Sequence, residues 1–182
     1  MVKTTIHKIR KISFIGGMCT GKTTLLKQYE DKPGIKTVKD SARDYLQINP
    51  ELDRSSISTH KQLAEEILQC EQITNTPNDN IIICDGSILT VVAHAVAYKN
   101  QDSANYLLKK YSFWLPSYEN FFLLNPKDIP YITDAVRTET EEFREVLHNA
   151  FLKLLVDLHL PYKLLSGTVK ERMLQVNKYL GI

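Results

Sequence analysis

The feature that most restricts the fold of this chain is a cluster of glycines near its start. Three of the chain's seven glycines fall within six positions: Gly16, Gly17 and Gly21. Residues 16–23 read G-x-x-x-x-G-K-T, a pattern that forms a binding loop where a strand precedes it and a helix follows it. Both elements are predicted, because the apolar run 12–15 is typical of a strand and helical spacing extends over about 22–29. The cluster therefore predicts an α/β fold organised around one strand–loop–helix unit.

A loop of this kind binds polyphosphate, because its backbone N–H groups and the positive end of the helix dipole face the phosphate oxygens. We expect ATP to be bound by nine consecutive residues: Gly16, Gly17, Met18, Cys19, Thr20, Gly21, Lys22, Thr23 and Thr24. Within this set, Lys22 is expected to contact the β- and γ-phosphates as a catalytic residue, and the Thr23 hydroxyl to bind Mg²⁺. The alternative is a glycine-rich turn without a ligand, which the agreement between motif and context disfavours.

Asp85 is the second candidate metal ligand. It follows the apolar run 81–84, which is typical of a central parallel strand covered on both faces, and it precedes Gly86. We expect Asp85 to hold Mg²⁺ through water, as the Walker B aspartate does, at the substrate-binding side of the sheet. The alternative is an aspartate that caps the next helix.

Apolar runs and helical patterns alternate along the rest of the chain. We expect five strands, over residues 12–15, 35–39, 81–84, 121–124 and 162–165. We expect six helices, over about 22–29, 58–74, 89–98, 103–111, 139–158 and 169–179. The alternation predicts an α/β domain with a five-stranded, mostly parallel sheet. Together with the glycine loop it indicates a P-loop NTPase fold, a three-layer sandwich in which helices cover both faces of the sheet. His94 lies among apolar residues of one predicted helix and is interpreted as a packing residue.

Length and composition indicate a single globular domain over residues 1–182, with no repeat or linker. The chain is 43% hydrophobic and contains no run of 18 apolar residues, so no membrane span is expected. The net charge of +2 gives no support to a nucleic-acid partner. Three cysteines at unrelated spacings and a start without an apolar leader favour a reducing, cytoplasmic location.

Four further segments, in the same order along the chain, resemble a known family. Residues 40–45 (D-S-A-R-D-Y) are similar to an E-x-A-R-x-[YF] segment, and residues 85–90 (D-G-S-I-L-T) to a D-T-D-x-x-T segment. Residues 128–137 (D-I-P-Y-I-T-D-A-V-R) resemble a D-x-P-W-x-x-D-G-x-R lid. Residues 164–167, with Arg172, are similar to a last strand, a nucleotide-base loop and a closing helix. These segments are typical of small, AAA-domain-like P-loop kinases, typified by the ribosylnicotinamide kinase domain of NadR.

The resemblance implies a nucleoside-kinase-like fold that transfers a phosphoryl group from ATP to an alcohol. The chain departs from the family pattern at Asp40, Ser87 and Ala135, where glutamate, aspartate and glycine are usual. These departures lie on the substrate side, so the acceptor is left open as a nucleoside-like small molecule.

Three charged residues have candidate roles in catalysis or substrate binding. Asp40 follows the second strand, at the sheet edge where α/β proteins bind ligands, and could accept a proton or a hydrogen bond from a substrate hydroxyl. A cap for the next helix is its alternative role. Arg43 could neutralise a substrate anion or pair with Asp40. Arg137 ends a lid predicted over about 125–138 as an exposed loop, and is expected to reach the transferring phosphoryl group, with a solvated arginine as the alternative.

The sequence therefore predicts an ATP- and Mg²⁺-dependent phosphotransferase that acts on a hydroxyl of a small, nucleoside-like acceptor. One alternative is a regulatory module that binds and slowly hydrolyses ATP and acts through a partner. A further alternative is a kinase of nucleic-acid ends.

Overall fold

The computed structural model describes residues 9–73, 80–132 and 139–182. Within these ranges the chain forms five strands: β1 (Arg10–Ile15), β2 (Ile35–Val38), β3 (Ile81–Asp85), β4 (Asn120–Leu124) and β5 (Tyr162–Leu165). The α-helices of the same ranges are α1 (Lys22–Leu26), α2 (Ser41–Ile48), α3 (Ile57–Ile73), α4 (Ile88–Ala97), α5 (Gln101–Tyr111), α6 (Glu141–Asp157) and α7 (Val169–Leu180). Two short 3₁₀ segments, η1 (Ser112–Ser117) and η2 (Pro126–Asp128), flank β4. Among the described helices, none is long and apolar enough to cross a membrane.

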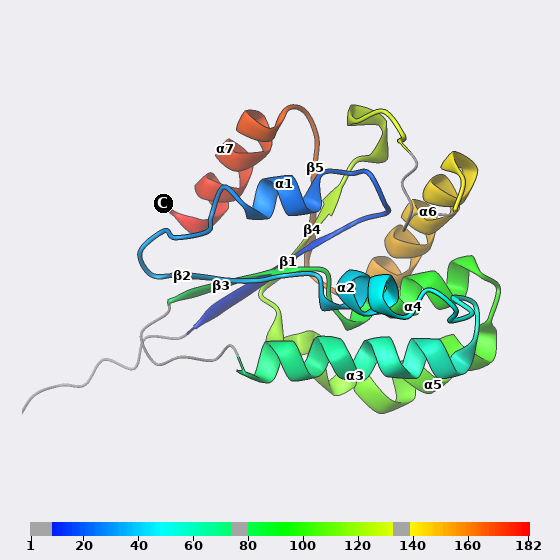
Figure 1. Cartoon of the computed structure of the whole chain (residues 1–182). Helices are drawn as coiled ribbons and strands as arrows, with labels where there is room; N and C mark the ends of the chain where they lie inside the picture. The colour runs from blue at the N-terminus through cyan, green and yellow to red at the C-terminus, as the bar shows by residue number, and fades with distance from the viewer. Residues whose placement is uncertain (1–8, 74–79, 133–138) are drawn as a thin grey trace, which may run out of the picture.

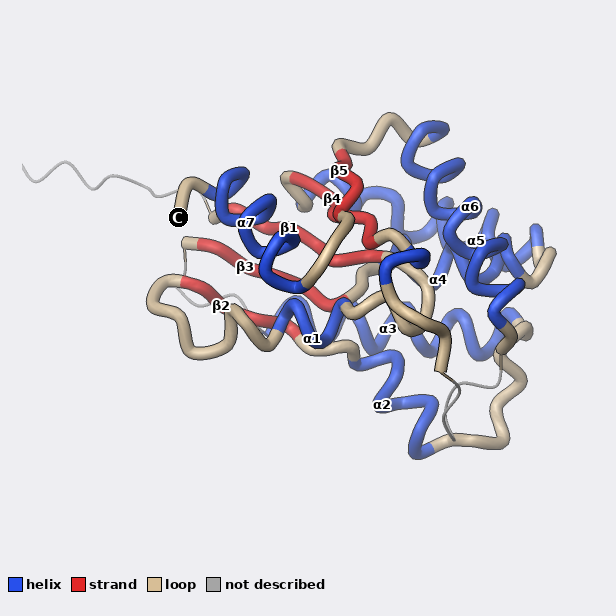
Figure 2. The backbone as a smooth tube through the Cα atoms, turned by 90° about the horizontal axis from the view of Figure 1, so that it is seen from above, coloured by secondary structure: helices blue, strands red, loops and turns tan. Residues whose placement is uncertain are grey.

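The sheet has the strand order β2-β3-β1-β4-β5, and each neighbouring pair is parallel. Successive residues of a strand point to opposite faces, so Phe14 packs against α1 and α7 while Ile15 packs against the helices of the other face. Figure 1 shows α1 and α7 above the sheet and α3, α4 and α5 below it, and Figure 2 shows α1 and α7 overlying the strands from above. The predicted three-layer α/β sandwich with five strands is therefore confirmed.

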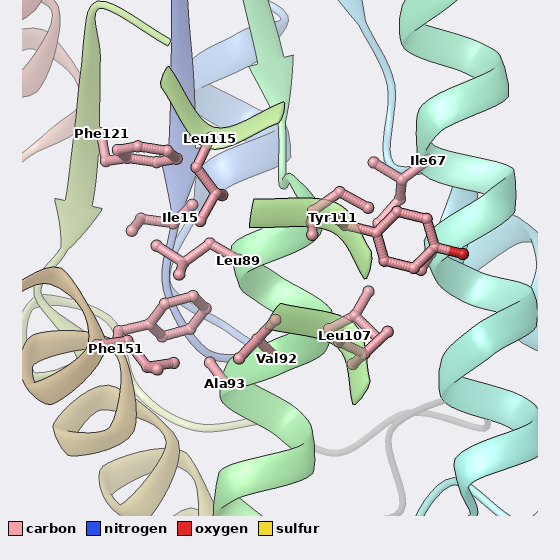
Figure 3. Close-up of a cluster of buried hydrophobic side chains, with 14 of the residues drawn as sticks. Ile15, Ile67, Leu89, Val92, Ala93, Leu107, Tyr111, Leu115, Phe121 and Phe151 are labelled. Atoms are coloured by element: carbon pink, nitrogen blue, oxygen red, sulfur yellow. The ribbon is translucent and has the colours of Figure 1, made fainter. Parts of the chain in front are cut away.

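Helix α4 is the centre of the larger apolar core. Seven of its residues are buried: Ile88, Leu89, Val91, Val92, Ala93, Ala95 and Ala97. In Figure 3, Leu89 and Val92 lie between Phe151 of α6 on one side and Leu107 and Tyr111 of α5 on the other. A helix covered on nearly all sides has little freedom to move, so the few polar side chains that it carries are held in fixed positions.

Two helices differ from what the sequence predicted. Helix α1 ends at Leu26 rather than near residue 29, and residues 27–30 form turns. Helix α2 was not expected. It is eight residues long and none of its residues is fully buried, so it lacks the long apolar stripe by which a helix is recognised in a sequence.

The loop predicted as exposed over 125–138 is partly built into the fold. Pro126 is buried, and Asp128 accepts a hydrogen bond from the backbone N–H of Gly167 at 2.7 Å. The backbone carbonyl of Ile129 accepts a hydrogen bond from Arg144 at 2.9 Å. The predicted exposed loop is therefore confirmed only in part: residues 127, 128, 130 and 132 are exposed, whereas Pro126 is buried and the Ile129 carbonyl is satisfied by Arg144.

Two buried arginines connect this stretch to the glycine loop (residues 16–23). Arg172 of α7 is 1% exposed, pairs with Asp128 at 2.8 Å and donates a hydrogen bond to the carbonyl oxygen of Thr20. Arg144 of α6 is 4% exposed and donates to the carbonyl oxygen of Cys19 at 3.5 Å, as well as to that of Ile129. Helices from distant parts of the sequence thus hold the carbonyl side of the glycine loop.

His60 makes a separate buried contact between α3 and α5. Its Nδ1 lies 2.7 Å from the Ser103 hydroxyl. Burial lowers the pKa of His60 to about 4, although Asp53 and the Arg54 backbone oppose the shift. The folded protein therefore holds His60 uncharged at neutral pH.

Substitution of Arg172 by methionine should destabilise the protein by about 3 kcal/mol, because Asp128 and the Thr20 carbonyl lose a buried, charged partner. Urea unfolding at neutral pH measures this difference. Lys153 is the matched control, because it forms an exposed ion pair with Asp157 on α6. Lys153→Met should change the free energy of unfolding by no more than about 0.5 kcal/mol. Equal effects of the two substitutions would contradict a structural role for Arg172.

Acidification from about pH 6.5 to pH 4 should lower the melting temperature in part through His60. In the unfolded chain this histidine binds a proton near its ordinary pKa of about 6.5, whereas in the folded protein it does so only near 4. Protons in this window therefore favour the unfolded state. Thermal unfolding at several pH values should show a shallower loss for His60→Asn, while the exposed His159→Asn should follow the original protein. Parallel curves for all three proteins would show that His60 does not contribute.

Candidate active site

The pairing of β1 with β3 brings the glycine loop and Asp85 together. Phe14 of β1 pairs with Asp85 of β3, and the Phe14 carbonyl accepts a hydrogen bond from the Gly86 N–H at 2.9 Å. The buried hydroxyl of Ser13 donates to the Gly86 carbonyl at 2.7 Å. The glycine loop, which follows β1, therefore begins beside the end of β3, at the carboxyl edge of the sheet, as the sequence predicted for Asp85.

One cavity of about 440 Å³ extends along this edge. Its loop end is lined by most of the glycine loop and by Thr24. Its other end, here called the helical end, is lined by five polar side chains: Arg54, His60, His94, Tyr98 and Glu139. Asp40 and Arg43 also line the cavity. A cavity of this size can hold a small ligand, and the two ends offer it different chemistry.

The glycine loop has the form required for phosphate binding. Gly21 has φ +84°, a left-handed conformation that favours glycine, and a Cβ there would lie 2.7 Å from the Cδ1 atom at the end of the Ile129 side chain. The backbone N–H groups of Gly17, Met18, Thr20 and Gly21 donate no hydrogen bond to other backbone groups of the described ranges. With the loop carbonyls of Cys19 and Thr20 held by arginines, these N–H groups are available to an anion at the helix start.

Lys22 belongs to both the loop and the cavity. Its Nζ donates hydrogen bonds to the carbonyl oxygens of Gly16 and Gly17, each at 2.9 Å. These bonds place the ammonium group above the loop, where the β- and γ-phosphates of a bound nucleotide would lie in a loop of this class.

Thr23 and Asp85, the two predicted metal ligands, are in contact. The Thr23 hydroxyl donates to Asp85 Oδ2 at 2.6 Å, whereas Oδ1 is buried and has no hydrogen-bond partner among the described residues. Burial raises the pKa of the Asp85 carboxyl and Asp40 raises it further, while Lys22 and Thr23 oppose them. Helix α4 is capped at Ser87, so Asp85 is not its N-cap.

These residues fit Mg²⁺. A buried carboxylate oxygen without a partner is costly, and a cation supplies the missing interaction. Mg²⁺ usually takes only one or two protein oxygen ligands and completes its shell with phosphate and water. A carboxylate and a hydroxyl 2.6 Å apart beside the glycine loop are such a donor set.

Asp40 caps helix α2 and also lines the cavity. Its Oδ1 accepts a hydrogen bond from the Arg43 N–H at 3.1 Å, which caps the start of α2. The same side chain lines the cavity and affects the pKa of Asp85, so it also lies on the ligand side. Arg43 lines the cavity as well, and its charge lowers the pKa of Asp85.

The helical end was not found from the sequence. Tyr98 donates a hydrogen bond to Glu139 Oε1 at 2.7 Å, and Arg54 pairs with the same oxygen at 3.1 Å. Burial opposes ionisation of Glu139, but the hydrogen bond from Tyr98 and the charge of Arg54 hold its pKa below the usual value. One signal was present in the sequence. Thr90, His94 and Tyr98 recur at four-residue spacing on an otherwise apolar helix, and all three line the cavity.

The described part of the predicted lid lies against the cavity. Ile129, Pro130 and Ile132 line it, and the Cys19 thiol donates to the Ile132 carbonyl at 3.0 Å. Tyr131 donates a hydrogen bond to the Glu139 carbonyl. Arg137, the predicted lid arginine, lies outside the described residues.

Comparisons with known proteins agree with this arrangement. A family model described as an AAA domain matches residues 11–172. A crystal structure of NadR protein in complex with NR superposes with a TM-score of 0.77 at 16% identity, covering 96% of this chain and 51% of that chain. A crystal structure of NadR protein in complex with NAD and AMP-PNP gives a TM-score of 0.76 at 17% identity, covering 96% of this chain and 50% of that one.

The chain thus spans about half the length of these NadR chains. No curated protein matches it. At these identities the likeness to NadR concerns the fold, whereas the family model covers most of the chain. The chain belongs to the AAA domain family, and its fold is that of a P-loop NTPase similar to the NadR structures.

Proposed function

We propose that the protein transfers the γ-phosphoryl group of ATP to a hydroxyl of a small, nucleoside-like acceptor, with Mg²⁺ as cofactor. The observation that carries the proposal is the continuity of the cavity. One space of about 440 Å³ joins the glycine loop to Asp40 and to a separate set of polar side chains on the helices. A protein that only hydrolyses ATP needs no second compartment of this kind. The NadR structure in complex with NR further supports a nucleoside-like acceptor.

The proposed roles follow from position. The loop N–H groups and Lys22 bind the β- and γ-phosphates, and Thr23 and Asp85 hold Mg²⁺. When bound, Mg²⁺ neutralises charge on the phosphate oxygens. The acceptor hydroxyl oxygen forms a bond to the γ-phosphorus while the bond from that phosphorus to the β–γ bridging oxygen breaks. Asp40 accepts the hydroxyl proton, or orients the hydroxyl through a hydrogen bond.

Two arginines complete the proposal. Arg43, on the first turn of α2, stabilises the negative charge of the bound phosphates or of the acceptor. Arg137 acts from the lid on the transferring phosphoryl group, where its charge contributes mainly in the transition state.

Release of ADP, measured with and without an acceptor, tests the function. The panel consists of nicotinamide riboside, adenosine, guanosine, cytidine and uridine. A phosphotransferase forms ADP only with an acceptor and forms one phosphorylated nucleoside per ADP. ADP release at the same rate without any nucleoside would instead identify an ATPase and overturn the proposal.

Lys22→Ala should lower turnover at least about a hundredfold, because it removes the positive side chain closest to the transferring group in a site of low dielectric. The fold should persist, since Lys22 is not part of either apolar core. Steady-state kinetics and thermal unfolding measure the two effects. Lys27→Ala, an exposed lysine just after α1, is the control and should retain full turnover. Normal turnover of purified Lys22→Ala would exclude the proposed role.

Asp40→Asn should reduce acceptor phosphorylation by about a hundredfold or more, while Mg²⁺·ATP still binds, because the amide cannot take up the proton. Asparagine is also a good N-cap, so α2 should remain intact. Asp85→Asn should instead raise the Mg²⁺ concentration needed for half-maximal turnover. Mg²⁺ titrations of both variants and of the exposed Asp44→Asn separate the roles. A higher Mg²⁺ requirement in Asp40→Asn alone would reverse the two assignments.

A further inference from the structure

His94 is one of the polar side chains that line the helical end of the cavity. It is carried by α4, one turn after Thr90 and one turn before Tyr98, and all three residues line the cavity. Lys22 from α1, Asp40 from the start of α2 and Glu139 from before α6 all act on the pKa of His94. The imidazole is therefore close enough to interact electrostatically with Lys22 of the glycine loop, with Asp40 and with Glu139.

The hydrogen bonding of His94 fixes which nitrogen carries the proton. Its Nδ1 lies 2.8 Å from the backbone carbonyl oxygen of Thr90, and a carbonyl can only accept a hydrogen bond. Nδ1 therefore carries the hydrogen. Burial lowers the pKa of His94, although the bond to Thr90 opposes this shift, so the ring is neutral near pH 7. In a neutral ring with Nδ1 protonated, Nε2 presents a lone pair and can only accept.

Aromatic neighbours hold the ring in this orientation. The His94 ring centroid lies 6.4 Å from those of both Tyr98 and Phe143, and these two rings pack against each other at 4.7 Å. Because α4 is packed on nearly all sides, the ring has little room to change its rotamer. Nε2 is thus a fixed hydrogen-bond acceptor.

His60 supplies a second uncharged imidazole at the same end of the cavity. It is 1% exposed, its ring lies 6.3 Å from that of Tyr98, and its Nε2 has no hydrogen-bond partner among the described residues. A buried nitrogen without a partner that lines a cavity indicates a polar ligand or water in that cavity. Leu46, Leu63 and Val91 supply apolar surface beside these polar groups.

We propose that Nε2 of His94 determines acceptor specificity by accepting a hydrogen bond from a second O–H or N–H group of the acceptor, distinct from the hydroxyl that reacts at Asp40. This inference rests on the proposed function. An acceptor with only its reacting hydroxyl would leave the imidazole nitrogen buried and unpaired, and a site of this kind rejects such ligands strongly. The preferred acceptors are therefore compounds with at least two donors, such as ribonucleosides.

Two substitutions of His94 test the proposal. His94→Phe keeps an aromatic ring against Tyr98 and Phe143 but removes the nitrogen, whereas His94→Gln keeps a polar group near the Nε2 position. His148 is the matched control, because it is also a half-buried histidine with a lowered pKa but lies on α6 and does not line the cavity. Circular dichroism and thermal unfolding first establish that each variant is folded.

The measurement is KM and kcat for the best nucleoside of the panel and for its analogues that lack the 2′-hydroxyl, the 3′-hydroxyl or the base amino group. In His94→Phe, the KM for the nucleoside should rise about tenfold to a hundredfold, with kcat and the KM for ATP changed less than about threefold. His94→Gln should recover part of the loss, and His148→Phe should show none. The analogue that lacks the group contacted by His94 should have nearly the same KM in the original protein and in His94→Phe, because the substitution then removes no interaction. That analogue identifies the contacted group.

Three outcomes would overturn the inference. An unchanged nucleoside KM in folded His94→Phe excludes a specificity role, and a fall in kcat at constant KM assigns His94 to the chemical step instead. Nitrogen-15 spectra of the ligand-free protein that show the proton on Nε2 exclude the acceptor role, whatever the protein phosphorylates. If the original protein phosphorylates no nucleoside, the proposed function itself is overturned. If it phosphorylates a nucleoside but His94→Phe leaves the nucleoside KM unchanged, only the inference about His94 fails.

Discussion

The register between β1 and β3 is the constraint on which the candidate site depends. Phe14 lies opposite Asp85, Gly86 directly follows Asp85, and the glycine loop begins two residues after Phe14. A shift of one residue would turn Asp85 to the other face of the sheet, away from Thr23. The register is fixed by apolar residues on both faces and by the two bonds that Gly86 makes to Ser13 and Phe14. The distance between the two proposed metal ligands is thus set by strand packing.

A second constraint acts from outside the sheet. The glycine loop is held on its carbonyl side by Arg144 and Arg172, which come from α6 and α7. Guanidinium groups suit this task, because each can donate to several carbonyl oxygens and still pair with a carboxylate, here Glu141 and Asp128. Burial of two such charges is costly, and each is compensated by these bonds. The loop therefore depends on long-range contacts as well as on its own glycines.

Local pattern was sufficient to predict the strands, the glycine loop and the position of Asp85, because each is encoded within a few consecutive residues. Helix α2 was missed because it buries none of its residues fully. The helical end of the cavity was missed for a different reason. Glu139, Arg54 and Tyr98 come from three separate segments, and only the tertiary fold brings them together. His94 was interpreted as a packing residue, and it does pack against aromatic rings, but it also lines the cavity.

The two hydrogen bonds of Lys22 to the Gly16 and Gly17 carbonyls have a consequence for nucleotide selectivity. When a nucleotide binds, the Lys22 ammonium group would leave these carbonyl oxygens and donate to phosphate oxygens instead. The number of hydrogen bonds would stay nearly the same, but the acceptors would then be charged rather than neutral. The contribution of Lys22 to affinity is then almost wholly coulombic and increases with the negative charge of the ligand. A nucleoside monophosphate, whose single phosphate leaves the β- and γ-positions vacant, would obtain little from this exchange. We therefore expect the loop to favour nucleotides with more phosphates, independently of the base.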